Sequence, residues 1–395
     1  MSFLKRTGLI LLLSFLCFAS VSGAGQSGKL ITVVFQSKWF PQAQFAGYWS
    51  AGGHLPGEAS SKYAPKDSKG LNFYAQEGLD VIILNGGSVN PSVNVAAGNA
   101  DFGTDWIANM LVQRKAGLDL VHIAQVFQLP GYLFVARKSS NIKSVKEFKG
   151  KNVGVWAFGN EFPAQACFIA NGLSSDLDPK IQKPDLKTTI YAFDPALVFP
   201  DKVDAASAMI YNELDQIVGL GYPLNQLSLI SAAASGCGLL EDFIFTTRKL
   251  LQSSNWKNSG LSGKELAKRF VRASLKGWQW AIANQAQAVK TVIDFCGDTC
   301  QGSGKNQSKQ IHQTWQMARV AEMAQPSLIR SADILKIFGL QKTPSAVTLG
   351  CLNLKDYDRT VKLLEKVGLI PAGTGDPAKV LSSEIMNSIS AKCPQ

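Results

Sequence analysis

Histidine is scarce in this chain of 395 residues, which contains only His54, His122 and His312. None of them lies beside a pair of cysteines, so the spacing of a structural zinc site is missing. The chain also has no Gly-x-Ser-x-Gly, His-Glu-x-x-His or strand-linked Gly-x-Gly-x-x-Gly motif. A histidine-based mechanism is hard to assemble from so few residues. These absences predict a protein that is not an enzyme, with no catalytic residue, no metal and no cofactor.

Long apolar runs are missing as well, except at the start of the chain. Lys5 and Arg6 precede an apolar stretch at 9–18, and small residues follow at 20–24. This order is typical of a secretory signal peptide, which we expect to span residues 1–24 and to be removed. An uncleaved anchor is the alternative, but the apolar stretch is short for a membrane-spanning helix. We expect a soluble, exported protein of the periplasm.

Basic residues outnumber acidic residues by 40 to 29, and the formal net charge is +11. The charge is dispersed along the chain, and the densest basic segment, 143–151, is short and contains Glu147. Nucleic-acid binding requires a basic stripe with interleaved aromatic residues, which the sequence lacks. The basic balance therefore predicts a solvated surface and no nucleic-acid partner.

Six cysteines remain after the signal segment, and export would place them in an oxidising compartment. Cys296 and Cys300 have the spacing of a local bridge, and Cys351 with Cys393 is a second candidate pair. Cys167 lies on a helical stretch and is expected in the core. The sequence alone leaves the connectivity open.

Short apolar runs alternate with helical patterns as far as residue 247, and helical patterns dominate afterwards. This alternation predicts an α/β fold with parallel sheets covered by helices. The predicted strands are 30–35, 79–84, 100–103, 120–125, 132–136, 152–156, 188–192, 205–210, 228–230 and 242–246.

The length left after the signal segment is too great for one compact core and suits two lobes. Two α/β lobes followed by a helical tail fit a clamshell that closes on a ligand by hinge motion. We predict lobe one from residues 30–121 plus 243–395 and lobe two from residues 122–242. The segment 52–70 is rich in glycine, serine and proline and predicts an exposed insertion, or alternatively a flap beside the ligand.

An aromatic loop follows the first predicted strand and contains Trp39, Gln44 and Tyr48. Open α/β sheets bind ligands at the carboxyl ends of their strands, which is where this loop begins. Aromatic rings offer flat faces, and the amide of glutamine offers a paired donor and acceptor. The loop therefore predicts a small, flat, hydrogen-bonding ligand.

Further candidates also lie where predicted strands end. Glu213 is the leading polar anchor because a carboxylate can pair with an amine or an aminopyrimidine, although it could equally be a first-turn helix charge. The alternatives for the others are a plain turn, a hinge hydrogen bond or a helix cap. The remaining candidates for ligand contact are Gly87 and Ser88 through their backbone amides, and Trp106, Gln128, Trp156 and Asn160.

Taken together, these segments resemble the periplasmic solute-binding proteins of ABC importers, in the branch named for fungal thiamine-pyrimidine synthases. The resemblance implies a type II clamshell fold, a monomer, and a small-molecule ligand passed to an ABC transporter permease in the membrane. The cysteine-rich iron motif of the synthases is absent, so the resemblance does not imply their chemistry. The matching blocks are Trp39 with Pro41-Gln42-Ala43-Gln44-Phe45-Ala46-Gly47-Tyr48, Glu77-Gly78-Leu79-Asp80-Val81, Gly98 with Ala100-Asp101-Phe102-Gly103, Gly150-Lys151 with Val153-Gly154-Val155-Trp156, and Tyr211-Asn212-Glu213.

The resemblance and the residues lead to one prediction with three alternatives. The prediction is a binding protein for an aromatic heterocycle, a thiamine pyrimidine precursor. One alternative ligand is riboflavin, and another is a small anion such as a sulfonate, taurine or nitrate. The remote alternative is a pyrimidine synthase-like enzyme that uses pyridoxal phosphate.

Overall fold

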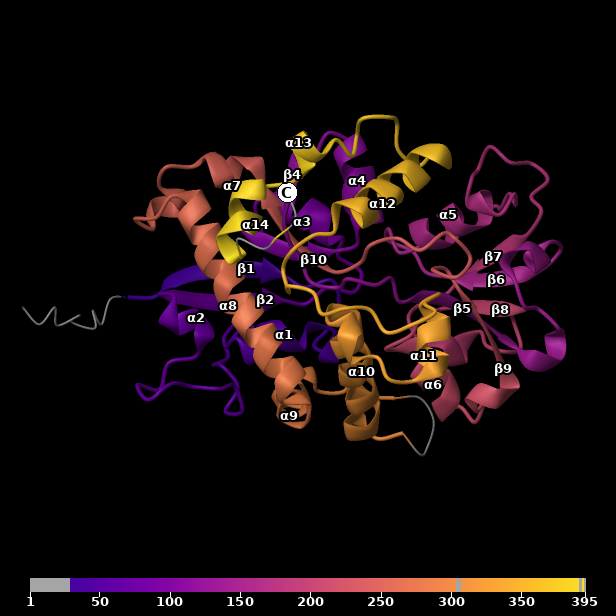
Figure 1. Cartoon of the computed structure of the whole chain (residues 1–395), viewed down its shortest axis with the longest axis horizontal. Helices are drawn as coiled ribbons and strands as arrows, with labels where there is room; N and C mark the ends of the chain where they lie inside the picture. Colours follow the sequence, from indigo (N-terminus) through magenta and orange to yellow (C-terminus); the bar gives the residue numbers. More distant parts are fainter. Residues whose placement is uncertain (1–28, 303–306, 391–392, 394–395) are drawn as a thin grey trace, which may run out of the picture.

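The computed structural model describes residues 29–302, 307–390 and 393. Figure 1 shows an elongated molecule in which two sheets lie far apart, with helices along and between them. The predicted signal peptide, residues 1–24, lies outside the described residues.

The first sheet has the strand order β2-β1-β3-β10-β4. Strand β1 pairs in parallel with β2 and β3, whereas β10 runs antiparallel to β3 and β4. The strands of this sheet are β1 (Ile31–Gln36), β2 (Leu79–Leu84), β3 (Phe102–Asp105), β4 (Leu120–Gln125) and β10 (Phe243–Thr247).

The second sheet has the order β7-β6-β8-β5-β9 and repeats this plan. Strand β6 pairs in parallel with β7 and β8, and β5 runs antiparallel to β8 and β9. Its strands are β5 (Tyr132–Arg137), β6 (Asn152–Val155), β7 (Lys187–Ile190), β8 (Ala205–Met209) and β9 (Leu227–Ser231).

The expectation of purely parallel sheets was wrong for β5 and β10. Both strands follow the segments that cross between the sheets, 126–131 and 232–242. A parallel neighbour needs a crossover connection that returns the chain to the starting edge. A chain that arrives directly from the other sheet has no such connection, and it enters antiparallel.

Fourteen α-helices connect the strands or follow them within the described residues. Three of the four longest begin at a side-chain cap, at Ser262 before α8, Ser308 before α10 and Asn353 before α12. They are α1 (Ala46–Ser50), α2 (Phe73–Gln76), α3 (Pro91–Ala96), α4 (Ile107–Lys115), α5 (Phe162–Ala170), α6 (Glu213–Gly219), α7 (Arg248–Gln252), α8 (Gly263–Ala283), α9 (Gln285–Cys296), α10 (Lys309–Ala324), α11 (Ala332–Ile337), α12 (Leu354–Lys366), α13 (Pro377–Val380) and α14 (Ser383–Ile389).

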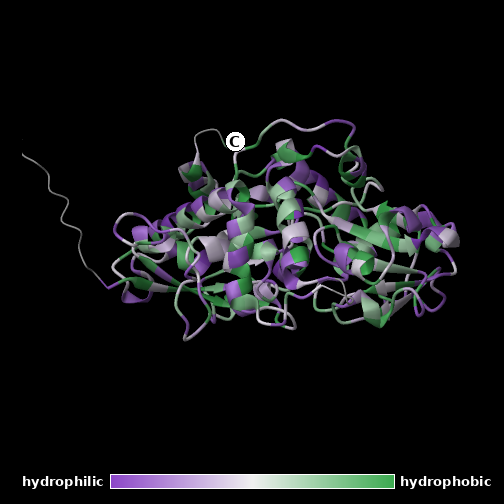
Figure 2. Cartoon of the chain, turned by 90° about the horizontal axis from the view of Figure 1, so that it is seen from below, coloured by the Kyte–Doolittle hydropathy of each residue, from purple (hydrophilic) through white to green (hydrophobic). Residues whose placement is uncertain are grey.

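Helix α8 is the main packing helix of the first lobe, and its apolar face packs against α1 and β4. In Figure 2 the long helices carry both green and purple stretches, which is typical of helices with one face on a core. Trp278 of α8 is 1% exposed and belongs to the main hydrophobic core. A Cβ atom on Gly47 of α1 would lie 2.1 Å from Cγ of Trp278, so only glycine allows this approach.

Three disulfides are formed in the structure. The two expected bridges, Cys296–Cys300 and Cys351–Cys393, are present. The expectation that Cys167 lies in the core is confirmed, because it is fully buried, and it is also bridged to Cys237. These two cysteines are 70 residues apart in the chain, and only the tertiary structure brings α5 beside the second crossing segment.

The inserted segment 52–70 lies against the first sheet and α9. His54 forms a bridge with Ile82 at the edge strand β2, and Ser61 Oγ donates to Asp294 Oδ2 at 2.8 Å. None of the residues of this segment lines the cavity described below, so the structure favours an insertion over a flap. Within the described residues, no helix has both the length and the apolar character needed to cross a bilayer.

Candidate functional site

A cavity of about 140 Å³ lies between the two sheets. Its lining comes from segments that follow the carboxyl ends of β1, β3, β6, β7 and β8, the position at which open α/β sheets bind ligands. The lining residues are Lys38, Trp39, Gln42, Gln44, Trp106, Trp156, Ala157, Phe158, Asn160, Ile190, Tyr191, Ala192, Phe193, Met209, Tyr211, Asn212 and Glu213.

Aromatic rings from both lobes form the walls of this cavity. The rings of Trp106 and Trp156 are neighbours in its wall, with centroids 6.4 Å apart and planes tilted by 56°, and Tyr191 lies 6.0 Å from Trp156. At the mouth, Trp39 meets Phe193 edge-on at 4.1 Å. Such rings present flat π faces and little hydrogen-bonding capacity, so the walls suit a flat aromatic ligand.

Two phenylalanines at the mouth have left-handed backbone conformations, which are uncommon for bulky residues. Phe158 has φ 60° and Phe193 has φ 39°. Their side chains are 57% and 39% exposed, although both line the cavity. Strained backbone of this kind clusters at ligand-binding sites, where the surrounding structure holds a side chain in place.

Glu213 supplies a carboxylate to the cavity and is 6% exposed. Its Oε2 accepts from the Met209 backbone N–H at 2.8 Å, and its Oε1 accepts from Asn212 Nδ2 at 2.7 Å. Burial raises the pKa of Glu213 to about 7, and the two hydrogen bonds oppose part of that rise. Each oxygen keeps a free lone pair, so the carboxylate can still accept from a ligand.

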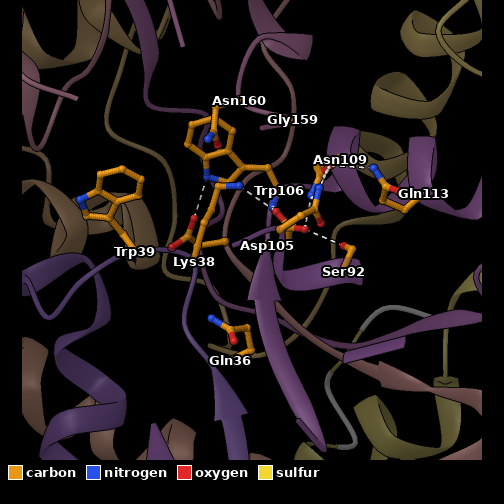
Figure 3. Close-up of polar contacts among 12 residues, drawn as sticks. Gln36, Lys38, Trp39, Ser92, Asp105, Trp106, Asn109, Gln113, Gly159 and Asn160 are labelled. Atoms are coloured by element: carbon orange, nitrogen blue, oxygen red, sulfur yellow. Dashed lines mark hydrogen bonds and ion pairs between the residues drawn. The ribbon is translucent and has the colours of Figure 1, made fainter. Parts of the chain in front are cut away.

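Lys38 also lines the cavity, but its charge is already paired (Figure 3). Its Nζ lies 2.8 Å from Asp105 Oδ1 and 4.4 Å from the centroid of the Trp106 ring. Asp105 is fully buried, and its Oδ2 accepts from Ser92 Oγ at 2.6 Å and Asn109 Nδ2 at 2.5 Å. Because Asp105 neutralises Lys38, this lysine offers little charge to an anionic ligand.

Asp242 lies behind the cavity lining and orients two of the lining residues through hydrogen bonds. It accepts from Gln44 Nε2 and from Trp106 Nε1, each at 2.9 Å. Burial raises the pKa of Asp242 to about 7, and the hydrogen bond from Gln44 and the charge of Lys38 oppose the rise. These bonds hold the Trp106 ring and the Gln44 amide in fixed orientations before a ligand arrives.

Six of the ten residues predicted from the sequence line the cavity. They come from four separate loops that only the fold brings together. They are Trp39, Gln44, Trp106, Trp156, Asn160 and Glu213.

The structure places the other four outside the cavity. Tyr48 is 1% exposed and packs on Phe35, because the chain turns into α1 before reaching it. The Gly87 amide donates to the Lys38 carbonyl at 3.3 Å, and Ser88 is exposed. Gln128 Nε2 donates to the Gln125 carbonyl at 3.3 Å, which is the hinge hydrogen bond considered as its alternative role, and to the Cys351 carbonyl at 3.1 Å.

Sequence reasoning missed several lining residues, and the signals for them differ. Asn212 directly precedes Glu213, Lys38 directly precedes Trp39, and Tyr191 lies near the end of the predicted strand 188–192, so position alone could have indicated these three. Phe193 carried no such signal, because its role depends on Trp39, which is distant in sequence. No group of His, Cys, Asp or Glu side chains suited to a metal ion occurs in the described part of the chain.

Comparison with known proteins gives one family and two kinds of relative. The family model described as NMT1/THI5 like matches residues 68–288. The riboflavin-binding protein RibY of Chloroflexus aurantiacus is 26% identical over 275 residues, which cover 67% of this chain. The match spans 66% of RibY, just under two thirds of that protein's length.

Solved structures with the same fold include two sulfonate-binding proteins. The alkanesulfonate-binding protein SsuA from Xanthomonas axonopodis pv. citri aligns with a TM-score of 0.53 and 13% identity, covering 90% of this chain and 100% of its own. The periplasmic aliphatic sulphonate binding protein SsuA from Escherichia coli also aligns with a TM-score of 0.53, at 12% identity, covering 90% and 93%. At such identities they establish the fold alone. The resemblance seen in the sequence is confirmed: this chain belongs to the NMT1/THI5 like family and has the two-lobed α/β fold of periplasmic solute-binding proteins.

Proposed function

We propose that this protein captures a small aromatic heterocycle, a thiamine pyrimidine precursor, and delivers it to the membrane permease of an ABC importer. The observation that carries the proposal is the combination of two neighbouring tryptophans, Trp106 and Trp156, with the buried carboxyl of Glu213 in one cavity. The rings would stack on the heterocycle, and Glu213 would accept from its amino group. In this role the protein binds and releases its ligand unchanged.

Charge supports a heterocycle over a small anion such as a sulfonate, taurine or nitrate. Among the described residues that line the cavity, Lys38 is the only cation, and Asp105 pairs with it at 2.8 Å. Glu213 lines the same space, and Asp242 is hydrogen-bonded to two of the lining residues, Gln44 and Trp106. An anion would meet these carboxyl groups without a free positive charge to compensate them.

Riboflavin is the second candidate, and two observations favour it. One is the similarity to RibY, whose name describes a riboflavin-binding protein. The other is a second cavity of about 520 Å³, which shares Trp39, Gln42, Phe193 and Asn212 with the first. A ligand longer than one ring could extend from the first cavity into the second.

Calorimetric titration of the mature protein with hydroxymethyl-aminopyrimidine tests the proposal, with riboflavin and taurine titrated in parallel. We expect the pyrimidine alone to bind, at micromolar affinity or tighter, on the order of −8 kcal/mol. If riboflavin alone binds, the second candidate replaces the pyrimidine as the proposed ligand. If taurine alone binds, the proposal of an aromatic heterocycle is wrong. If none of the three compounds binds, the proposed function is wrong.

We further propose that the ligand closes two lobes, formed by residues 30–121 plus 243–395 and by residues 122–242. The strands support this division, because β1–β4 and β10 form one sheet and β5–β9 form the other. At the crossings, Gln125 Nε2 donates to the carbonyls of Phe127 and Glu241, both at 2.7 Å. These bonds tie the two connecting segments together as a hinge. We propose an exported monomer.

Gly159 provides a test of lobe closure. It has φ +91°, and a Cβ there would lie 2.3 Å from Asn109 Oδ1 and 3.4 Å from Asn90 Nδ2, both in the first lobe. We therefore expect Gly159→Ala to hold the lobes apart and to weaken ligand binding by about tenfold or more. Titration calorimetry measures the affinity, and small-angle scattering of the liganded protein measures the opening.

Gly172→Ala is the matched control for this substitution. Gly172 has φ +80°, and its added Cβ would meet nothing within 4 Å. Both variants carry similar backbone strain, on the order of 1 kcal/mol. Equal affinity and equal dimensions for the two variants would show that Gly159 has no part in closure.

A further inference from the structure

A chain of buried polar side chains leads from the ligand cavity to helix α10. It comprises Glu213, Asn212 and Asp215 at the start of α6, with His312 and Gln316 on α10. His312 is 1% exposed, and Gln316 is fully buried. Because α10 packs mainly on α9 and on the loop after β1, these contacts join the first lobe to the second.

The orientation of each amide in this chain follows from a backbone donor. The Gln44 backbone N–H can only donate, and it lies 3.2 Å from Gln316 Oε1. Gln316 must therefore turn its Nε2 toward Asn212, whose Oδ1 accepts at 2.7 Å. With its oxygen used in this way, Asn212 presents Nδ2 to Glu213 Oε1 at 2.7 Å.

The same logic determines which ring nitrogen of His312 donates to Asn212. Its Nε2 lies 2.9 Å from Asn212 Oδ1, an acceptor, so Nε2 carries a proton. Its Nδ1 lies 2.7 Å from Asp215 Oδ2 on the other side of the ring. His312 is thus held between Asn212 and Asp215, with Nε2 as the donor to Asn212.

We propose that His312 is a positioning residue, which locks Asn212 so that Glu213 meets the ligand as a hydrogen-bond acceptor. This inference rests on the proposed function and narrows its ligand class. If Asn212 rotated, it would turn its own oxygen toward the carboxylate of Glu213 and its NH₂ toward the NH₂ of Gln316. The cleft therefore selects a heterocycle with a donor edge, such as an amino group, over an analogue of the same shape without one.

The first test is ¹⁵N NMR of the histidine-labelled protein at about pH 7.5, where an ordinary imidazole is mostly neutral. We expect Nε2 of the His312 ring to carry a proton, because it donates to Asn212 Oδ1. His122 is the internal reference for a buried neutral ring, because burial lowers its pKa to about 4. A His312 ring whose Nε2 carries no proton would overturn the inference. This measurement needs no ligand, so it remains decisive even if every heterocycle fails to bind.

The second test compares His312→Gln with His54→Gln, a control whose ring bonds to Asp80 on the outer edge of the first sheet. We expect His312→Gln to weaken binding of hydroxymethyl-aminopyrimidine by about tenfold or more. The reason is that the glutamine side chain cannot hold Asn212 and Asp215 in the positions in which the imidazole ring holds them. The preference of this variant for the aminopyrimidine over the same pyrimidine without the amino group should also fall. An unchanged preference in a folded His312→Gln protein would refute the positioning role. If this variant does not fold, the NMR result decides.

Discussion

Replacing Trp278 by alanine is expected to lower the free energy of unfolding by about 3–5 kcal/mol, the range for removing a large buried side chain. The indole is 1% exposed and packs edge-on against Tyr48 and Phe127. Gly47 contacts the indole directly and has no side chain that could fill the space left by its removal. Urea unfolding followed by circular dichroism measures the change.

Trp280→Ala is the control, since it removes the same side chain two residues further along α8. Trp280 is only partly buried, so we expect a clearly smaller loss. Ligand affinity of the folded Trp278→Ala protein should remain near that of the unaltered protein, because Trp278 does not line the cavity. Equal losses of stability for the two variants would show that the aromatic cluster around Trp278 is not a packing centre.

Replacing Glu213 by glutamine is expected to weaken binding of an aminopyrimidine by about 1.5–3 kcal/mol, the range for hydrogen bonds to charged groups. Both carboxylate oxygens of Glu213 already accept, from the Met209 N–H and from Asn212 Nδ2. A glutamine would have to place its NH₂ group against one of these donors, which also disturbs Asn212. Titration calorimetry at neutral pH measures the loss.

The pH dependence separates this role from a purely structural one. Burial raises the pKa of Glu213 to about 7, and only the ionised form is a pure acceptor. The affinity of the unaltered protein for an amino-bearing ligand should therefore rise as the pH increases through about 7. Glu213→Gln should lose this rise.

Glu147→Gln is the matched control for the acidic substitution. Glu147 forms a capping box with Ser144 in the second lobe and lies outside the cavity. The Glu147→Gln protein should keep both the ligand affinity of the unaltered protein and the pH dependence of that affinity. If Glu213→Gln binds as tightly as Glu147→Gln, then Glu213 does not contact the ligand.

Much of the fold could be predicted from local patterns. All ten predicted strands are present, and most of their boundaries agree within two residues, as for β2 (Leu79–Leu84) and β4 (Leu120–Gln125). Strand and helix periodicities are properties of neighbouring residues, so they are visible in one sequence. The direction of β5 and β10 was not visible, because it depends on how the chain crosses from one sheet to the other.

The candidate site divides in the same way. The sequence by itself determined that aromatic, amide and acidic side chains follow the ends of strands, and it identified Trp106, Trp156 and Glu213. Only the tertiary structure decided that Asp105 neutralises Lys38 and that Phe193 meets Trp39. The reason is physical: a strand end is encoded locally, whereas the charge and shape of a cavity depend on partners that folding brings from distant parts of the chain.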